Sequence, residues 1–179
     1  MKELSLHMLD IAQNSFAAGA AHVGLTVEEA GGWLTLTVAD DGKGMSPDFL
    51  ASVTDPFTTT RTTRKVGLGL PLLRMAAELT GGTLDIQSQL GRGTTVTARF
   101  RADHIDCPPL VDMAGTVSLL VQGLPDGVEL VYTRRTPKGE FRLDTGEIRE
   151  ILGPDVPLSA PDVAQWVRGY ADEGEQSVM

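Results

Sequence analysis

The sequence is poor in cysteine and has no long apolar run. Its single cysteine, Cys107, has no second cysteine to pair with and lies in no metal-ligand spacing, which fits a reducing cytoplasm. No apolar stretch approaches the roughly 18 residues that a membrane-spanning helix needs. Met1–Leu4 lacks the apolar core of a signal peptide. We therefore expect a cytoplasmic protein with no membrane partner.

Basic residues are also scarce. The chain has 15 Lys and Arg against 24 Asp and Glu, a formal net charge of −9. Sequence-independent binding to nucleic acid needs clustered cations that displace counterions from phosphates, so this composition argues against a nucleic-acid partner. An acidic protein that binds a phosphorylated ligand must gather its cations locally. Arg61, Arg64 and Lys65 form one such group.

Residues 3–18 have the pattern of an amphipathic helix, because their apolar residues fall on one broad arc. Glu3, His7, Asp10 and Asn14 recur at helical spacing beside that arc and form a narrow polar stripe. A solvated helix face would explain such a stripe. Short polar side chains are nevertheless poor choices inside a helix. Asp10 and Asn14 lie one turn apart, where one could order a water molecule while the other holds a metal ion.

Two strands are predicted next, the second ending at Asp40, with Gly31-Gly32 in a loop a little longer than the tightest hairpin type. Alternation places Asp40 on the apolar side, at the last inward position of its strand. A carboxylate there needs a donor, and the exocyclic amine of adenine would supply one. Gly42 and Gly44 would let the backbone approach a flat ring and adopt positive φ. The alternative is an ordinary Asp-Gly turn.

Residues 46–66 lose regular periodicity beyond a short helical turn after Ser46-Pro47. Their centre has one large apolar anchor, Phe57, followed by a run of hydroxyls and cations: Thr58, Thr59, Thr60, Arg61, Thr62, Thr63, Arg64 and Lys65. Such a composition suits a mobile cover that closes over phosphates. A solvated loop without a ligand would have the same composition.

The run Gly67-Leu68-Gly69-Leu70 precedes a predicted helix that has Pro71 in its first turn and ends at Gly81-Gly82. Glycines just before a helix N-terminus leave backbone amides free to bind an anion, and the helix dipole favours negative charge there. The run fails the dinucleotide fingerprint, since position 72 is Leu where a third glycine belongs.

A second hairpin is predicted after this helix. Leu84, Ile86 and Ser88 alternate, the chain turns at Gly91-Arg92-Gly93, and Thr94 begins a strand that reaches Phe100. The order helix, hairpin, cover, helix, hairpin predicts an α+β fold. We expect a two-layer sandwich in which a mixed, mostly antiparallel sheet carries helices on one face.

Taken together, these stretches resemble the GHKL superfamily of ATP-binding domains, which includes gyrase-type topoisomerases, the heat-shock chaperone, histidine kinases and the mismatch-repair protein MutL. The resemblance covers roughly residues 3–100. Its motifs, in the family's order, are Asp10-Ile11-Ala12-Gln13-Asn14 (N box), Asp40-Asp41-Gly42-Lys43-Gly44-Met45 (first glycine box), Asp55-Pro56-Phe57-Thr58-Thr59 (phenylalanine box), Gly67-Leu68-Gly69-Leu70 (second glycine box) and Gly91-Arg92-Gly93-Thr94.

The resemblance implies the GHKL, or Bergerat, fold and a site for ATP and Mg²⁺. In this site Asn14 ligates magnesium, Asp40 accepts a hydrogen bond from the adenine amine, and Thr94 supplies a hydroxyl near adenine. The lid from Thr58 to Lys65 and the second glycine box from Gly67 to Leu70 enclose the phosphates.

Two departures limit what the resemblance implies. The general-base position of the ATP-hydrolysing branches is usually Glu and is Asp10 here, one methylene shorter, so binding is expected and hydrolysis is in doubt. We also expect no phosphoacceptor module, because no helical pair with a His-Glu motif precedes the domain. His7 is interpreted as a polar neighbour of the site.

Residues 1–103 are thus expected to form the ATP-binding domain, and residues 104–179 a small α+β region that folds alone or packs on it. Structural support is favoured over partner docking as the role of this region. Its predicted elements are a helix near 110–121, strands near 128–134 and 140–143, and two short helices with cap signals at Asp144 and Ser159.

Three functions fit this sequence. The favoured one is a regulatory protein that transfers phosphate from Mg-ATP to a protein partner, with Asp10 activating a hydroxyl or an imidazole. The second is an ATP-driven switch, in which lid closure changes docking or homodimer formation and slow hydrolysis resets it. The third is a nucleotide sensor without chemistry, motivated by the short Asp10 side chain.

Overall fold

The computed structural model describes the backbone of residues 3–53 and 64–179, and their side chains except those of 64–68. The helices are α1 (Leu4–Ala17), α2 (Pro47–Ser52), α4 (Arg64–Leu79), α5 (Met113–Gln122), α6 (Thr145–Leu152) and α7 (Pro161–Ser177). The strands are β1 (His22–Ala30), β2 (Trp33–Asp40), β3 (Thr83–Gln89), β4 (Gly93–Arg101), β5 (Glu129–Thr136) and β6 (Gly139–Asp144).

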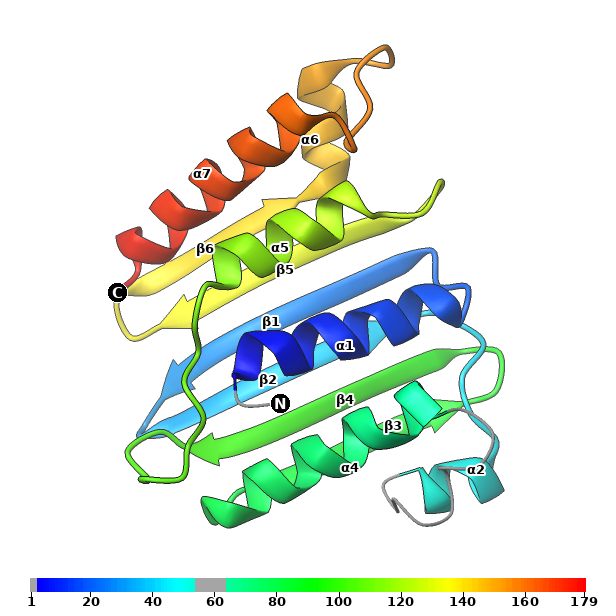
Figure 1. Ribbon diagram of the computed structural model, residues 1–179, viewed down its shortest axis with the longest axis vertical. Coiled ribbons are helices and arrows are strands. Elements are labelled where there is room, and N and C mark those ends of the chain that lie inside the picture. Colours follow the sequence, from blue (N-terminus) through cyan, green and yellow to red (C-terminus); the bar gives the residue numbers. More distant parts are fainter. Residues whose placement is uncertain (1–2, 54–63) are drawn as a thin grey trace.

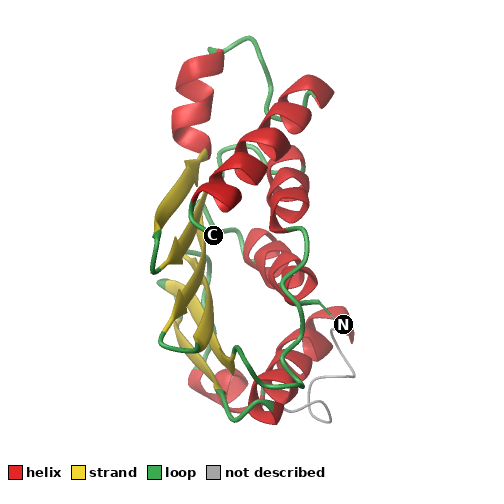
Figure 2. Cartoon of the chain, turned by 90° about the vertical axis from the view of Figure 1, so that its left-hand side faces the viewer, coloured by secondary structure: helices red, strands yellow, loops and turns green. Residues whose placement is uncertain are grey.

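The strands form one six-stranded sheet in the order β3-β4-β2-β1-β5-β6. Every neighbouring pair is antiparallel except β1 and β5, which are parallel. Figure 1 shows α4, α1, α5 and α7 lying side by side in front of the sheet, and Figure 2 shows the layer of helices on one face of it. The predicted two-layer α+β sandwich with a mixed, mostly antiparallel sheet is therefore confirmed.

The hairpin between β1 and β2 is tighter than expected. Ala30 pairs directly with Trp33, so only Gly31 and Gly32 form the turn. Their φ angles are 59° and 82°, and positive φ at both central residues defines the type I′ turn that suits the twist of two-residue hairpins. The prediction of a longer loop was wrong because two consecutive glycines permit this conformation without steric strain.

Helix α4 begins earlier than its sequence signals indicate. The prediction placed Gly67 and Gly69 ahead of the helix and Pro71 in its first turn, but the helix starts at Arg64 and encloses all three. An interior glycine costs about 1 kcal/mol relative to alanine, which the surrounding helix-forming residues can offset. The amides after Gly67 and Gly69 therefore lie within a helix and not at its free N-terminus.

Residues 104–179 continue the same sheet. Strand β5 pairs with β1 over His22–Glu28, and β6 extends the sheet by one further strand. The sequence left open whether residues 104–179 fold alone or pack on the region before them, and the structure shows that they pack on it.

The last helix is longer than predicted. Helix α7 begins after Ala160 without a side-chain cap, so Ser159 is not its N-cap. Asp144 does cap α6, because its side chain accepts a hydrogen bond from the Gly146 amide.

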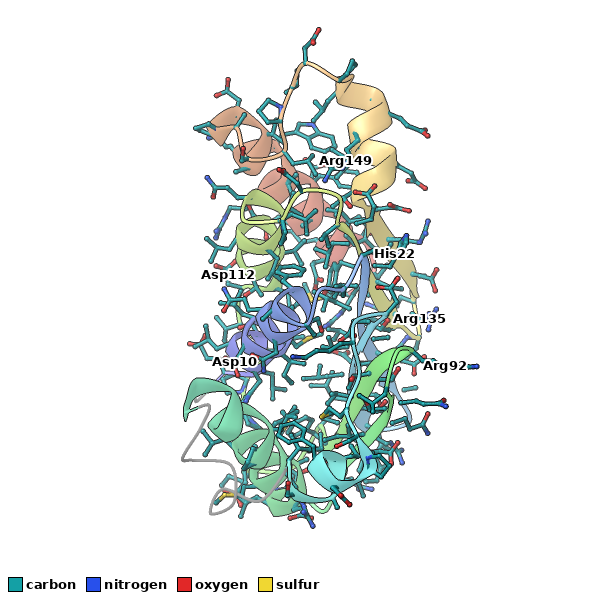
Figure 3. The ribbon with its side chains drawn as sticks, turned by 90° about the vertical axis from the view of Figure 1, so that its right-hand side faces the viewer. Asp10, His22, Arg92, Asp112, Arg135 and Arg149 are labelled. Atoms are coloured by element: carbon teal, nitrogen blue, oxygen red, sulfur yellow. The ribbon has the colours of Figure 1, made fainter. Side chains whose placement is uncertain are left out.

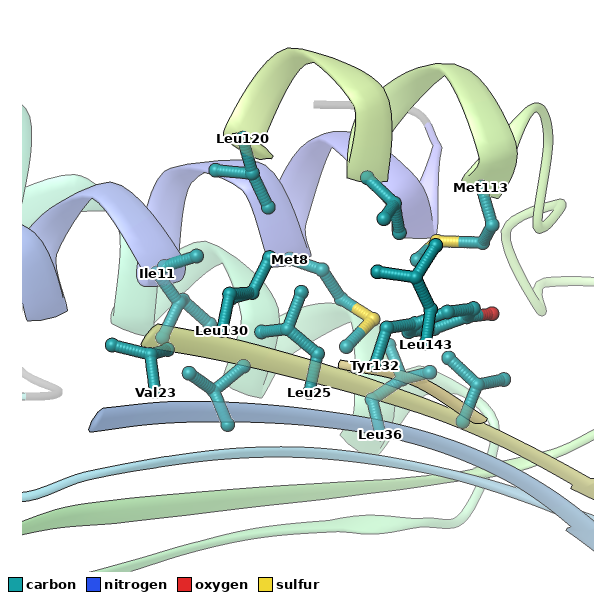
Figure 4. Packing of buried hydrophobic residues seen from close by; sticks show 14 of the residues in the cluster. Met8, Ile11, Val23, Leu25, Leu36, Met113, Leu120, Leu130, Tyr132 and Leu143 are labelled. Carbon is teal, nitrogen blue, oxygen red and sulfur yellow. The ribbon is translucent and has the colours of Figure 1, made fainter. Parts of the chain in front are cut away.

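The core is continuous between α1 and the C-terminal region. Figure 4 shows Met8 and Ile11 of α1 packed with Leu25 of β1, Leu130 of β5 and Leu120 of α5. All five are at most 5% exposed. Because α1 also carries the N box, the core that fixes this helix is built partly by residues 104–179.

A buried ion network ties α7 to the sheet. The Arg134 guanidinium of β5, 3% exposed, lies 2.6 Å from a Glu29 carboxylate oxygen and 3.6 Å from one of Glu175. The Tyr132 hydroxyl donates a hydrogen bond to Glu175 as well. Loss of either glutamate would leave a buried charge poorly compensated, so this network holds α7 in one position.

None of the described helices has the length and apolar character needed to cross a membrane.

Candidate functional site

A pocket of about 240 Å³ opens between α1, the ends of β2 and β4, α2 and α4. Its walls are mainly apolar, and its polar side chains, except that of Ser15, come from the predicted motifs. The polar lining residues are Asn14, Ser15, Asp40, Lys43 and Thr94, and the others are Ile11, Ala17, Ala18, Val38, Gly44, Met45, Phe49, Val53, Leu70 and Val96. An apolar cavity with a few convergent polar groups is the usual form of a small-molecule site.

Asp40 ends β2 on the helix side of the sheet, as its alternation with Leu36 and Val38 predicts. One carboxylate oxygen, Oδ2, accepts a 2.6 Å hydrogen bond from the Ser15 hydroxyl. The other, Oδ1, accepts a 2.9 Å bond from the Gly42 amide. Two donors from different elements thus fix the plane of the carboxylate at the floor of the pocket. Its remaining lone pairs can accept from a ligand amine.

Thr94 lies directly opposite Asp40, because the two residues are paired between β2 and β4. The Thr94 hydroxyl is 2.8 Å from that of Ser88 on β3, which also accepts a 2.8 Å bond from the Met45 amide. Ser88 therefore connects the wall of the pocket to the chain that follows the first glycine box.

The first glycine box is close to the chain's own backbone. A Cβ at Gly44, whose φ is 71°, would lie 2.0 Å from the Gln89 carbonyl oxygen. A Cβ at Gly42 would lie 2.9 Å from the Ala18 carbonyl oxygen. Gly44 has the predicted positive φ, whereas Gly42 does not. The glycines are needed for packing against α1 and the β3-β4 turn, whether or not a ring approaches them.

Asp41 braces the same loop from outside the pocket. Its Oδ1 accepts bonds from the Ala21 and His22 amides at 2.8 and 2.9 Å, and its Oδ2 lies 2.8 Å from the His22 Nδ1. The His22 amide and ring hold the pKa of the Asp41 carboxyl below its usual range. Adjacent aspartates thus have separate roles: Asp40 faces the pocket and Asp41 holds the loop.

Helix α1 places Asn14 and Asp10 differently, although they lie one turn apart. Asn14 lines the pocket. Asp10 does not, and Figure 3 shows it at the side of α1 that faces α4. Its Oδ2 is buried without a hydrogen-bond partner among the described residues, and a Cβ at Gly69 of α4 would lie 2.1 Å from that atom. Burial raises the pKa of the Asp10 carboxyl.

His7 is 1% exposed, so the polar stripe of α1 is not a solvated face at this position. The His7 side chain lies one turn before Asp10 on the same side of α1, as the three-residue spacing of the two residues predicts.

The predicted lid lies largely outside the described residues. Phe57, Thr58, Thr59, Thr60 and Arg61 fall between residues 53 and 64, and Arg64, Lys65, Gly67 and Leu68 are described only as the backbone of α4. Leu70, the last residue of the second glycine box, is buried and lines the pocket. Among residues with described side chains, Lys43 is the cation that lines it.

Sequence reasoning missed Ser15 and Ser88. Ser15 comes directly after the N box and falls on the apolar arc of the helix, close to Ile11. A hydroxyl on that face is a signal that it has a partner, and Ser15 is 3% exposed in the structure. Ser88 was recognised only as part of a strand. Its role depends on a contact with Met45 across 43 positions, for which the sequence contains no local signal.

No group of three or more His, Cys, Asp or Glu side chains that could hold a metal ion occurs among the described residues. Asn14 is the described amide side chain at the pocket wall, and an amide oxygen is a suitable hard ligand for Mg²⁺. One amide oxygen fits magnesium only as part of a site in which phosphates and water would supply the remaining ligands.

The comparisons with known proteins agree that the N-terminal part of the chain is similar to histidine kinase-type ATPase domains. The family model described as "Histidine kinase-, DNA gyrase B-, and HSP90-like ATPase" matches residues 1–104. The chain is 34% identical over 92 residues to the sensor histidine kinase ZraS of Escherichia coli, covering 50% of this chain and 20% of that protein. It is 36% identical over 104 residues to the histidine protein kinase DivJ of Caulobacter vibrioides, covering 56% and 17% respectively.

A solved structure, the N-terminal domain of a DNA repair protein, has a TM-score of 0.53 and 14% sequence identity, over 80% of this chain and 52% of that one. At this identity the likeness concerns the fold alone. The chain spans about a fifth of the length of the curated relatives it matches.

Proposed function

Because the chain belongs to the histidine kinase-, DNA gyrase B- and HSP90-like ATPase family, with an ATP-binding domain of the GHKL superfamily in residues 1–104, we propose that it transfers the γ-phosphoryl group of Mg-ATP to a protein partner. The observation that carries the proposal is the Asp40 carboxylate, which Ser15 and Gly42 orient at the floor of an apolar pocket. An adenine ring would fill that pocket and donate its amine to Asp40, with the Thr94 hydroxyl beside it.

The other end of the nucleotide would lie toward Asn14 and the N-terminal half of α4. Asn14, together with the phosphates, would hold magnesium, which neutralises charge as the phosphoryl group moves. Arg61, Arg64 and Lys65, with the threonines from Thr58 to Thr60, form the proposed lid. Their cations would offset a net charge of −9 that otherwise repels a polyphosphate.

Asp10 is the proposed general base. It would accept the proton of a hydroxyl or imidazole on the partner while that atom forms a new bond to the γ-phosphorus, the bond from that phosphorus to the bridging oxygen breaks, and ADP leaves. A pKa raised by burial makes the carboxylate a stronger base than an exposed one.

The position of Asp10 also favours a second candidate. Its buried oxygen contacts α4 and is absent from the pocket lining, so the base is covered in this conformation. A protein that only senses the nucleotide, without hydrolysis or transfer, needs no exposed base. The two candidates differ in whether label leaves ATP.

The test is incubation with magnesium and γ-labelled ATP, alone and with candidate partner proteins, while free phosphate and protein-bound label are followed together. We expect the label to be transferred to a partner protein by the wild type and not by the Asp10→Asn variant. Tight binding of ATP that stays intact with every partner tried would contradict transfer and support the sensor. Asp48→Asn, a change of the same kind at an exposed helix end, is the matched control and should transfer label normally.

A further inference from the structure

The C-terminal region carries most of the acidity of the chain. Residues 104–179 contain 13 acidic and 6 basic residues, a net charge of −7 out of −9 for the whole chain. The family model ends at residue 104, so this charge lies in a part of the molecule to which the ATPase family assigns no role. A surface of this kind attracts basic partners and repels acidic ones.

Helix α7 exposes two stacked aromatic rings within this region. Trp166 and Tyr170 are one turn apart, with ring centroids 5.1 Å apart and planes 5° from parallel. They are 47% and 41% exposed. The chain has only two Trp and two Tyr in all. Tyr170 is held from beneath by an edge contact with Phe141 of β6, 5.4 Å between centroids, so the pair is a fixed platform.

Carboxylates flank this platform along the helix. Asp162 precedes Trp166 by one turn and Glu173 follows Tyr170 by three positions, and both are exposed. At 100° per residue the four side chains fall within about 80° of the helix circumference. Neither carboxylate forms an ion pair with another described residue. We call Asp162, Trp166, Tyr170 and Glu173 the acidic aromatic stripe.

We propose that the acidic aromatic stripe binds a basic amphipathic helix of a partner protein. Rigid aromatic side chains supply apolar contact at a low cost in conformational entropy and are enriched at the centres of interfaces. Arginine and lysine pack favourably over such rings. Asp162 and Glu173 lie roughly 16 Å apart along the axis, so they select cations about three helical turns apart on either side of an apolar contact.

Figure 1 shows that α7 lies at the border of the helix layer, above β6, the last strand of the sheet. The ATP-binding pocket lies between α1, α2, α4, β2 and β4. A partner on α7 therefore need not compete with the nucleotide, and the inference does not rest on the proposed phosphoryl transfer.

The probe is a synthetic 18-residue amphipathic helix of Leu and Lys, and its counterpart has Glu at every Lys position. In a Trp33→Phe background, Trp166 is the one tryptophan, and its fluorescence reports contact. We expect saturable binding of the basic peptide with a blue shift of the emission, weakened by added salt, and no binding of the acidic peptide. Circular dichroism verifies that each variant is folded.

The variant pair Asp162→Asn with Glu173→Gln should raise the dissociation constant on the order of tenfold, since two ion pairs at an interface are lost. The matched control, Asp126→Asn with Asp172→Asn, removes the same charge at exposed positions off the stripe and should change it less than about twofold. Equal weakening by the control pair, an unmoved Trp166 emission, or no binding of the basic peptide would overturn the proposal. ATP affinity, measured in the same samples, tests the nucleotide site separately.

Discussion

Ser15 and Asp40 define the pocket at the scale of single residues, although they lie 25 positions apart. Asp40 was predictable because strand alternation alone puts it on the apolar side. Ser15 was not, because its function depends on how α1 crosses the end of β2. A local pattern gives the direction of a side chain, whereas the identity of its partner needs the packed structure.

Removing the Ser15 hydroxyl should weaken nucleotide binding without unfolding the protein. Ser15→Ala leaves Asp40 Oδ2 without its donor, so the carboxylate is no longer held in one plane. We expect the affinity for ATP, measured by calorimetry, to fall roughly three- to tenfold. Ser118→Ala is the matched control. This buried serine of α5 also donates a hydrogen bond to another helix, at the Ala164 carbonyl of α7, but it does not line the pocket. Equal losses in both variants would contradict the assignment.

Asp10 should destabilise the fold at neutral pH. Burial raises its pKa in the folded state, so folding favours the protonated carboxyl. The protein then loses stability as the pH rises from the unfolded value, about 3.9, through the raised folded value. Asp10→Asn removes the ionisation. Because the carboxyl is only partly buried and solvent screens its charge, the unfolding free energy at pH 7 should rise by no more than about 1 kcal/mol, at most a few degrees in Tm.

This gain should shrink as the pH is lowered into the range in which the wild-type carboxyl is protonated. Thermal melts of both proteins at a series of pH values provide the check. A variant that is less stable than the wild type at pH 7 would show that the Asp10 charge is compensated in the folded protein.

Helix α4 is the element for which the sequence was least informative. Its glycines and Pro71 resemble the punctuation that precedes a helix, and the prediction followed that signal. The tertiary contact of Gly69 with Asp10 is not visible in a local pattern. The strands of the β1-β2 and β3-β4 hairpins, by contrast, were predicted because alternation and glycine turns are local features, although the β1-β2 turn is tighter than expected.

Gly69 should be required by packing and not by helix propensity. Gly→Ala inside a helix ordinarily stabilises by about 1 kcal/mol. At Gly69 the added Cβ would meet Asp10 Oδ2 at 2.1 Å, so the carboxylate would have to leave its buried position against α4. Because the end of a side chain can move more easily than backbone, we expect Gly69→Ala to destabilise by only about 1 kcal/mol. Gly169→Ala on α7, where a Cβ meets nothing within 4 Å, should stabilise. Denaturant unfolding measures both, and a stabilising Gly69→Ala would contradict the contact between α1 and α4.

At the scale of the whole molecule, the division into two regions is visible in sequence but not in the sheet. The last family motif ends at Thr94 and the predicted ATP-binding domain at residue 103, but β5 pairs with β1 and the core is shared. The parallel β1-β5 contact joins residues more than 100 positions apart, and no periodicity encodes such a pairing. The C-terminal role is likewise absent from the family motifs.

We expect one cooperative unfolding transition for the chain. Trp33 lies in β2 and Trp166 in α7, so Trp166→Phe and Trp33→Phe give single-tryptophan proteins that report on each region separately. In each variant, the urea midpoint measured by tryptophan fluorescence should match the midpoint measured by circular dichroism. Two separated transitions would mean that residues 104–179 unfold independently.

The most direct test of the account is calorimetric titration of ATP into the wild type, Asp40→Asn and Asp41→Asn. Asp40→Asn replaces the charged acceptor at the pocket floor and should lower ATP affinity roughly tenfold to a hundredfold. Asp41→Asn makes the same chemical change in the adjacent residue outside the pocket. Its amide oxygen can still accept from the Ala21 and His22 amides that hold the loop, so affinity should stay nearly unchanged. A folded Asp40→Asn variant that binds ATP as tightly as the wild type would contradict the assignment of this pocket to adenine.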